Sequence, residues 1–256
     1  GIPAEPLFRS KYPEAKLLSE YQMLNKRLGQ ISEGKEAWLK HSQRYHDGRI
    51  HGSVITNACV SGRCSHRNPN MAQIPRVGQP YGAECRGLFY APHGWRQVGC
   101  DASGLELRGL GAQLAYFDGG EYAKLVSTEG FDIHTHNAKL FGIYDGQGTI
   151  EKRIREQAKT LIYAVLYGAG AQKLGTILDP SLGQYDQQDL GRETIETFYK
   201  NLPAIKKLKD KVDERVLDRG FLIGIDGRHL QIRSRHSALN QLLQSTGSLC
   251  VKKATC

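Results

Sequence analysis

An isolated carboxylate and a row of cationic and aromatic residues are the parts of this sequence most suited to chemistry. Asp101 ends an apolar, strand-like segment, and a carboxylate in that position suits a hard cation. Further along, two cations and two rings are spaced four residues apart: Arg155, Lys159, Tyr163 and Tyr167. On a helix this spacing forms one slowly turning stripe, which offers two charges and a ring to a nucleoside triphosphate. Together these features predict a site for nucleotidyl transfer.

Nucleotidyl transfer would give Asp101 a direct task. Metal ions bridge the attacking and leaving oxygens of such a reaction, and carboxylates near a tight backbone turn hold the ions. Asp101 would bind Mg²⁺, and the backbone carbonyl of Ala102 would add a neutral ligand. The structural alternative is that Asp101 merely ends a strand or caps a helix, since Asp is common at both places.

The stripe also has a structural alternative, which is a solvated basic helix face. The apolar face opposite the stripe would be formed by Ile154, Ala158, Leu161, Ile162 and Val165. A solvent-facing surface has no need of rings, so Tyr163 and Tyr167 favour a binding surface. In that interpretation Arg155 and Lys159 hold triphosphate oxygens through charge-assisted hydrogen bonds, each worth about 1.5–3 kcal/mol.

Three segments of the chain resemble family A DNA polymerases, and they occur in the family's order. Residues 62–75 (GRCSHRNPNMAQIP) are similar to the primer-template segment, residues 101–108 (DASGLELR) to the first palm motif, and residues 155–168 (REQAKTLIYAVLYG) to the fingers helix. The likeness runs from about residue 19 to about residue 254 and is strongest to the replicative polymerases of phages. It implies template-directed DNA synthesis, in which two Mg²⁺ ions assist nucleotidyl transfer from deoxynucleoside triphosphates to a primer 3′ end.

The resemblance further implies roles for residues near the incoming nucleotide. Glu106 would lie under the sugar and exclude a 2′-hydroxyl, the group by which proteins tell RNA from DNA. Ser103 and Glu106 also fit the capping-box pattern, in which the glutamate would turn back to the start of the helix instead. His134 would contact a phosphate, Tyr163 would pack against the incoming sugar and base, and Tyr167 would pack against the template side.

Six further residues match positions that contact DNA in the family. They are Arg63, Asn70 and Gln73 in the primer-template segment, and His236, Asn240 and Gln244 on the last helix. The helix positions would touch the minor-groove side of the primer terminus, where correct base pairs offer similar acceptors. The alternative is an ordinary polar face on an amphipathic helix. Histidine at the position of His236 is typical of the phage-like branch, whereas bacterial members carry arginine there.

The helices and strands that must position these residues are predicted to form an α+β chain. It would be a fragment of the right-hand polymerase fold, with a small antiparallel palm sheet, helical fingers and the root of the thumb. Apolar spacing predicts helices over 13–31, 104–116, 132–140 and 149–167, and a last helix from about 237. Strands are predicted over 50–60, 88–90 and 96–101, and Asp226-Gly227 predicts a hairpin joining 221–225 to 228–232.

The resemblance divides the chain into four parts. Residues 1–49 would form the lower thumb, and residues 50–117 would form the palm with the first metal-binding motif. Residues 118–210 would form the fingers with the nucleotide-binding helix. Residues 211–256 would return to the palm with the hairpin and the primer-terminus helix.

The composition suits nucleic acid as a partner better than a membrane. The 256 residues carry a net charge of +9, which favours binding to a phosphate backbone. No apolar stretch approaches the roughly 18 residues that would span a bilayer, and no secretory signal is visible over residues 1–10. The six cysteines lack zinc-site spacing. We therefore expect a cytoplasmic protein with free thiols, in the host cytoplasm if a phage encodes it.

The family's second palm motif, a strand-turn with His-Asp-Glu, is not found in the 256 residues. It would follow the last helix, and neither an exonuclease domain nor the thumb tip is recognisable. Asp226 in a hairpin turn and Asp132 at a helix start are poor substitutes for the missing carboxylate. The expectation is therefore a chain that is incomplete at its C-terminus and inactive alone.

Two other functions fit the sequence. A non-catalytic or split fragment would bind primer-template and nucleotide, and would need a separate C-terminal polymerase segment for activity. A single-subunit RNA polymerase has related palm and fingers motifs, but the glutamate at position 106 argues against it.

Overall fold

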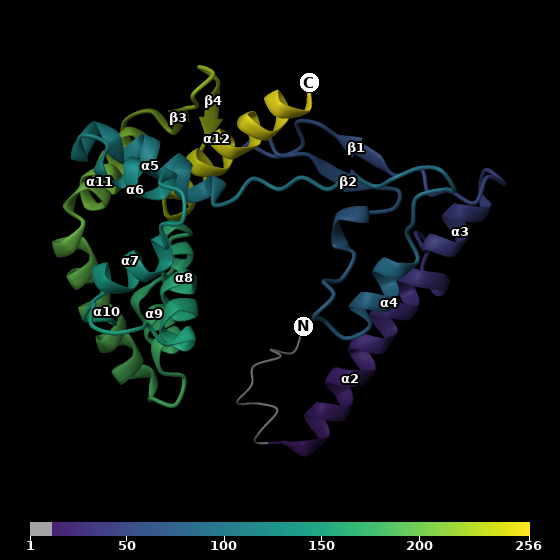
Figure 1. Ribbon diagram of the computed structural model, residues 1–256, viewed down its shortest axis with the longest axis horizontal. Helices are drawn as coiled ribbons and strands as arrows, with labels where there is room; N and C mark the ends of the chain where they lie inside the picture. Colours follow the sequence, from purple (N-terminus) through teal and green to yellow (C-terminus); the bar gives the residue numbers. More distant parts are fainter. Residues whose placement is uncertain (1–11) are drawn as a thin grey trace. The chain divides into compact units, whose positions relative to one another are not determined.

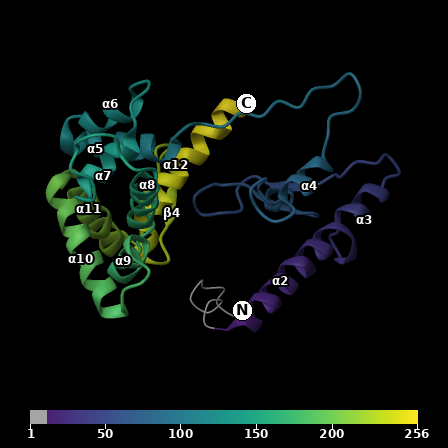
Figure 2. The ribbon, with the colours of Figure 1, turned by 60° about the horizontal axis from the view of Figure 1, so that its bottom comes forward.

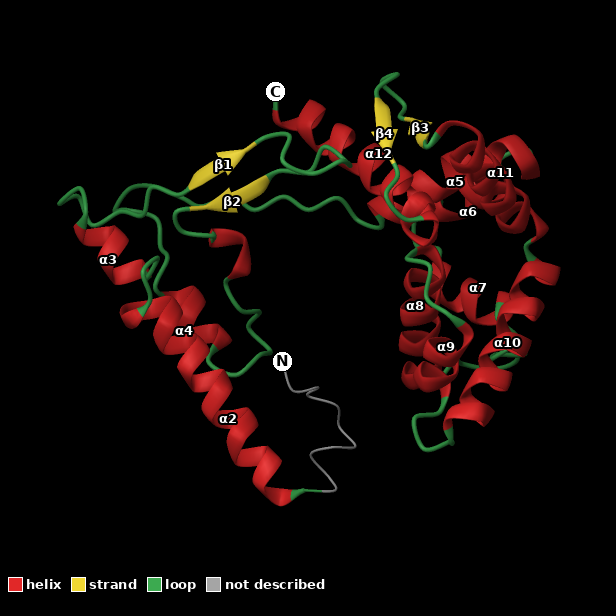
Figure 3. Cartoon of the chain, turned by 180° about the vertical axis from the view of Figure 1, so that it is seen from behind, coloured by secondary structure: helices red, strands yellow, loops and turns green. Residues whose placement is uncertain are grey.

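A computed structural model of the chain describes residues 12–256 (Figure 1). The chain divides into two compact units. The first comprises the described residues up to Ala58 together with Cys64–Gly99, and the second comprises Cys59–Arg63 together with Cys100–Cys256. Helices predominate, and the strands form two separate two-stranded antiparallel sheets, as expected of the predicted class (Figure 3).

The first unit is built on a long helix near the N-terminus. Its elements are α2 (Pro13–Leu28), the short π-helix η1 (Gly29–Glu33), α3 (Trp38–Gln43), β1 (Ser53–Ile55), β2 (Ser65–Arg67), the 3₁₀ helix η2 (Met71–Gln73) and α4 (Gly82–Gly87). Trp38 is buried and packs edge-on against Phe89, with 5.2 Å between ring centroids. Arg86 donates to the carbonyl of Pro75 at 2.9 Å, which ties the loop after η2 to α4.

The second unit is a helical body with one β-hairpin. Its elements are α5 (Leu105–Asp118), α6 (Glu121–Ser127), α7 (Ile133–Leu140), α8 (Lys152–Leu166), α9 (Ala171–Leu178), α10 (Gln184–Asn201), α11 (Pro203–Arg219), β3 (Phe221–Ile223), β4 (His229–Gln231), the 3₁₀ turn η3 (Arg235–Ser237) and α12 (Ala238–Thr255). In Figure 2, α7 and α8 lie close to α9 and α10. Leu222 faces Leu230 across the hairpin, which forms around Asp226-Gly227 as predicted.

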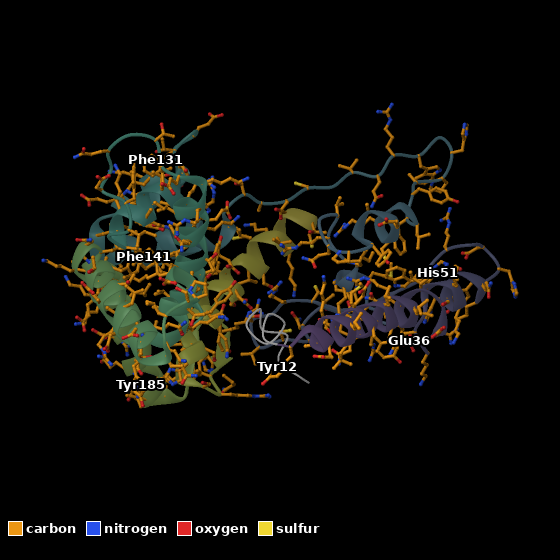
Figure 4. The ribbon with its side chains drawn as sticks, turned by 90° about the horizontal axis from the view of Figure 1, so that it is seen from below. Tyr12, Glu36, His51, Phe131, Phe141 and Tyr185 are labelled. Atoms are coloured by element: carbon orange, nitrogen blue, oxygen red, sulfur yellow. The ribbon has the colours of Figure 1, made fainter. Side chains whose placement is uncertain are left out.

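One continuous apolar core holds the second unit together. Leu110 of α5 and Leu161 of α8 are fully buried in it. Phe141, labelled in Figure 4, stacks on Phe198 of α10 with 4.2 Å between ring centroids. Each such buried side chain stabilises the fold by about 1.5–3 kcal/mol. The helix that follows Asp101 and the helix that carries the stripe are therefore fixed against the same core.

The end of α8 is set by Gly168, whose backbone has φ +76°. Glycine adopts this left-handed conformation without steric cost, so it suits the residue after a helix. A Cβ at this position would collide with the backbone carbonyl oxygen of His236. The last turn of α8 therefore lies directly against the turn that leads into α12.

The strands predicted over 88–90 and 96–101 are wrong, because the structure has neither helix nor strand over 89–102. A strand needs a neighbour that accepts and donates its ladder hydrogen bonds, and each sheet among the described residues has only two strands, both from other segments. Tyr90, Trp95 and Val98 are 83%, 73% and 88% exposed, so this apolar segment is not packed in the described part of the chain.

Most other predicted elements are present with shorter bounds. The strand predicted over 50–60 is reduced to Ser53–Ile55, and the helix predicted over 13–31 ends as an α-helix at Leu28. The helices predicted over 104–116, 132–140 and 149–167 match α5, α7 and α8 to within about three residues. The last predicted helix matches α12, which begins at Ala238.

Candidate active site

The cations and rings of the predicted stripe lie on one face of α8. Ala158, Leu161 and Ile162 on the opposite face are fully buried, which fixes the rotation of the helix. Lys159 is exposed and Tyr163 is half-buried. The rings of Tyr163 and Tyr167 are 6.2 Å apart between centroids, so the aromatic end of the stripe is continuous.

Arg155 is held by a carboxylate that the sequence did not single out for this purpose. Its Nε donates to Oδ2 of Asp132 at 2.7 Å, and its Nη2 donates to Oδ1 at 3.0 Å. Partial burial would raise the pKa of Asp132, but hydrogen bonds from Arg155 and Thr135 and the guanidinium charge outweigh it and lower the pKa to about 2. Asp132 therefore stays ionised at neutral pH.

His134 on α7 lies beside the cations of α8. Burial, together with the charges of Arg155 and Lys159, lowers the pKa of His134, while the charge of Asp132 acts against the shift. The imidazole is therefore neutral at neutral pH. Its Nδ1 is buried without a hydrogen-bond partner among the described residues.

Glu106 is bonded to the aromatic end of the stripe. The hydroxyl of Tyr167 donates to the Glu106 carboxylate, at 2.9 Å from Oε2 and 3.1 Å from Oε1. Partial burial and this bond raise the pKa of Tyr167 to about 12. The N-cap of α5 is Gly104, with φ +61° and no side-chain cap, so the capping box predicted as an alternative for Ser103 and Glu106 is wrong.

Asp101 and Ala102 lie in the exposed, extended segment that precedes α5. Their carboxylate and carbonyl oxygens are the kind of ligand that Mg²⁺ prefers. Among residues 12–256, no cluster of three or more His, Cys, Asp or Glu side chains is arranged to hold a metal ion.

The three predicted residues of the last helix differ in their surroundings. His236 lies in η3, just before α12, and its backbone meets Gly168 at the end of the stripe. Asn240 and Gln244 are half-buried rather than on a fully solvated face. Oδ1 of Asn240 is buried and has no hydrogen-bond partner in the described part of the chain.

The three predicted residues of the primer-template segment fall in different units. Arg63 belongs to the second unit and is close enough to Tyr167 for its charge to counteract part of the rise in that residue's pKa. Asn70 and Gln73 are exposed in the first unit. Asn70 caps η2 by accepting from the N–H of Ala72 at 3.1 Å.

Two contacts of the site had no signal in the sequence. The bond from Arg155 to Asp132 spans 23 residues, and the bond from Tyr167 to Glu106 spans 61 residues. Neither follows from helical spacing or from a local pattern. The first depends on how α7 packs against α8, and the second on how the start of α5 meets the end of α8.

Comparison with known proteins defines the class to which this fold and site belong. Residues 5–256 match the model of DNA polymerase family A. The chain therefore belongs to DNA polymerase family A, and the resemblance inferred from the three sequence segments is confirmed.

The relatives include polymerases of phages and bacteria. The chain is 41% identical over 258 residues to the DNA-directed DNA polymerase of Escherichia phage T7, covering 92% of this chain and 34% of the relative. The polymerase of Enterobacteria phage T3 matches with the same identity and coverage. DNA polymerase I of Chloroflexus aurantiacus is 31% identical over 223 residues, or 81% of this chain and 22% of that protein. The chain spans about a third of the length of the phage relatives.

A solved structure shares the fold. It is the POL domain of Pol1 from M. smegmatis in complex with DNA primer-template and dNTP, with a TM-score of 0.67 at 21% identity, covering 85% of this chain and 38% of that one. The predicted polymerase fold class is thereby confirmed. Within residues 12–256, no helix combines the length and the apolar character needed to cross a bilayer.

Proposed function

We propose that this chain contributes to template-directed DNA synthesis, in which a primer 3′ end receives a nucleotide from a deoxynucleoside triphosphate. The observation that carries the proposal is the convergence of Arg155, Lys159 and His134 from two adjacent helices, with rings continuing the same face. Membership of DNA polymerase family A and the nucleotide and primer-template in the similar solved structure support it.

Each group of residues would have its own task. Arg155 and Lys159 would bind triphosphate oxygens, and neutral His134 would donate from Nε2. Tyr163 would pack against the sugar and base, and Tyr167 against the template side while it holds Glu106 at the 2′ position of the sugar. The DNA would be contacted by Arg63, Asn70, Gln73, His236, Asn240 and Gln244.

Asp101 and the carbonyl of Ala102 would hold Mg²⁺ in this reaction. Two bound Mg²⁺ ions would neutralise phosphate charge and orient the primer hydroxyl for in-line attack.

Lys159→Ala tests the proposed binding of triphosphate oxygens by Lys159. We expect it to raise the KM for deoxynucleoside triphosphates by about tenfold or more, since one charge-assisted bond would be lost. Primer-template affinity, measured by fluorescence anisotropy, should change less than about twofold because Lys159 would face the nucleotide. Lys173→Ala on α9 is the matched control and should change neither value. A loss of duplex binding with unchanged nucleotide KM would reassign the stripe to the DNA backbone.

The pKa of His134 should report nucleotide binding directly. Without nucleotide, NMR titration of the imidazole should give a pKa below the ordinary histidine value of 6.5, as burial and the neighbouring cations lower it. A bound triphosphate would add negative charge beside the ring, so the pKa should rise toward or above 6.5. His136 on the same helix also has a pKa lowered by burial and by Lys139, and should not respond. Equal responses of the two histidines would contradict the placement of the triphosphate.

A further inference from the structure

The carboxylate of Asp132 is the junction between α7 and α8. Its Oδ2 accepts from Nε of Arg155 and from the hydroxyl of Thr135, both at 2.7 Å. Its Oδ1 accepts from Nη2 of Arg155 at 3.0 Å and from the backbone N–H of His134 at 3.1 Å. Each oxygen thus accepts two hydrogen bonds, which fills the acceptor capacity of a carboxylate. Asp132 is therefore poorly suited to bind a metal ion as well.

The two bonds to Arg155 use one particular edge of its guanidinium group. A guanidinium presents five N–H donors in a planar fork, and the Nε and Nη2 edge is occupied by Asp132. The edge formed by Nη1 and the second hydrogen of Nη2 remains. Its one contact with a carboxylate among residues 12–256, Oε1 of Glu156 at 3.4 Å from Nη1, is long and lies at an exposed side chain. That edge has the geometry for bidentate binding of a phosphate.

The same carboxylate starts the helix that carries His134. Asp132 is the N-cap residue of α7, and its side chain accepts from the N–H of His134. A cap of this kind fixes the first turn, and with it the direction of the side chains on that turn. Two of the three proposed triphosphate ligands are therefore oriented by one side chain, and neither orientation has to be established when nucleotide arrives.

We propose that Asp132 is a positioning residue that preorganises Arg155 and His134 to bind a triphosphate. This inference rests on the proposed function of the stripe. Asp132 also carries negative charge, which opposes an anionic ligand. That opposition is weak, because Arg155 neutralises the charge directly and both side chains are more than a third exposed to screening solvent. The orientation of Arg155 and His134 therefore outweighs the negative charge, so that Asp132 strengthens the binding of a triphosphate.

The test is a set of substitutions at position 132 in the protein at its natural length. Asp132→Asn retains one cap acceptor but places an amide donor against Arg155, and Asp132→Ser retains a cap but is too short to reach the guanidinium. Both should raise the KM for deoxynucleoside triphosphates by about tenfold or more, with kcat changed far less. Inhibition by inorganic triphosphate should weaken by the same factor. A purely structural role would lower the melting temperature without this selective change in KM.

A double-mutant cycle separates the inference from the function on which it rests. In an Arg155→Ala background, Asp132→Asn should lose most of its effect on the nucleotide KM, since the guanidinium group that Asp132 orients is gone. Asp189→Asn, which breaks an exposed ion pair with Arg192 on α10, is the control and should leave KM unchanged.

The outcomes are distinguishable. If Arg155→Ala leaves the nucleotide KM unchanged, the proposed function of the stripe is wrong. If Arg155→Ala raises KM but the Asp132 variants do not, or if they tighten nucleotide binding, only the positioning role is overturned. Independent, multiplicative effects in the double variant would likewise overturn it.

Discussion

Replacing Tyr163 by phenylalanine should make the protein, at its natural length, discriminate against dideoxynucleotides by roughly 10³-fold more than the parent does. Tyr163 is half-buried on the stripe, and partial burial and the charge of Glu106 raise its pKa, so its hydroxyl stays protonated and able to donate. In the proposed site this hydroxyl replaces the hydrogen bond lost when the 3′-hydroxyl of the nucleotide is absent. Without either hydroxyl, a charged oxygen of the nucleotide's triphosphate would be left without a hydrogen-bond donor.

The measurement is the ratio of kcat/KM for a deoxynucleotide to that for its dideoxy analogue. Tyr167→Phe is the matched control, because it removes a hydroxyl from the other ring of the stripe, whose bond goes to Glu106. It should leave the dideoxy ratio within a few-fold of the parent value. If Tyr163→Phe and the parent terminate equally often, the hydroxyl of Tyr163 does not face the sugar.

Asp101→Ala should reduce primer extension by at least about 10³-fold, since in the proposed site it would remove a ligand of ions that would stabilise the transferring phosphate by several kcal/mol. Primer-template affinity should remain within about twofold, because Asp101 would act on the metal rather than on the duplex. Asp189→Ala, an exposed carboxylate elsewhere in the second unit, is the control and should retain full extension.

The same assay tests whether residues 1–256 suffice for chemistry. We expect little or no extension by these residues alone, because one motif carboxylate cannot fix two ions roughly 3.5–4 Å apart. Adding a segment that carries His-Asp-Glu, fused or separate, should restore extension, and changing its Asp to Ala should abolish the rescue. Robust extension by residues 1–256 that disappears with Asp101→Ala would mean that the second metal ligand lies within them.

Sequence spacing was sufficient to predict the stripe, because a single helix determines which residues share its face. Four-residue intervals place Arg155 and Tyr163 together wherever α8 lies, and the buried Leu161 confirms the rotation. The hairpin at Asp226-Gly227 was predictable for the same reason, since its turn chemistry is local. The bounds of helices were less accurate, as helix ends depend on caps and on tertiary packing.

Predictions that needed a distant partner failed or could not be made. The strands over 88–90 and 96–101 were inferred from apolar residues alone, but a strand forms only where a neighbour completes its ladder. The capping box at Ser103 and Glu106 satisfied a local rule, yet Tyr167 binds the glutamate instead. Asp132 was predicted only to begin a helix and was judged a poor metal ligand, because nothing in the sequence places it beside Arg155.

The close approach of Gly168 to the backbone carbonyl of His236 limits which substitutions this chain can accept in evolution. Any side chain at position 168 would meet both an unfavourable φ and a backbone atom, so selection should remove every amino-acid substitution there. Insertions between these two positions face no such barrier where they fall in loops, such as the one between α9 and α10. Such loops can therefore be lengthened in evolution, whereas position 168 must remain glycine as long as the backbone of His236 lies against it.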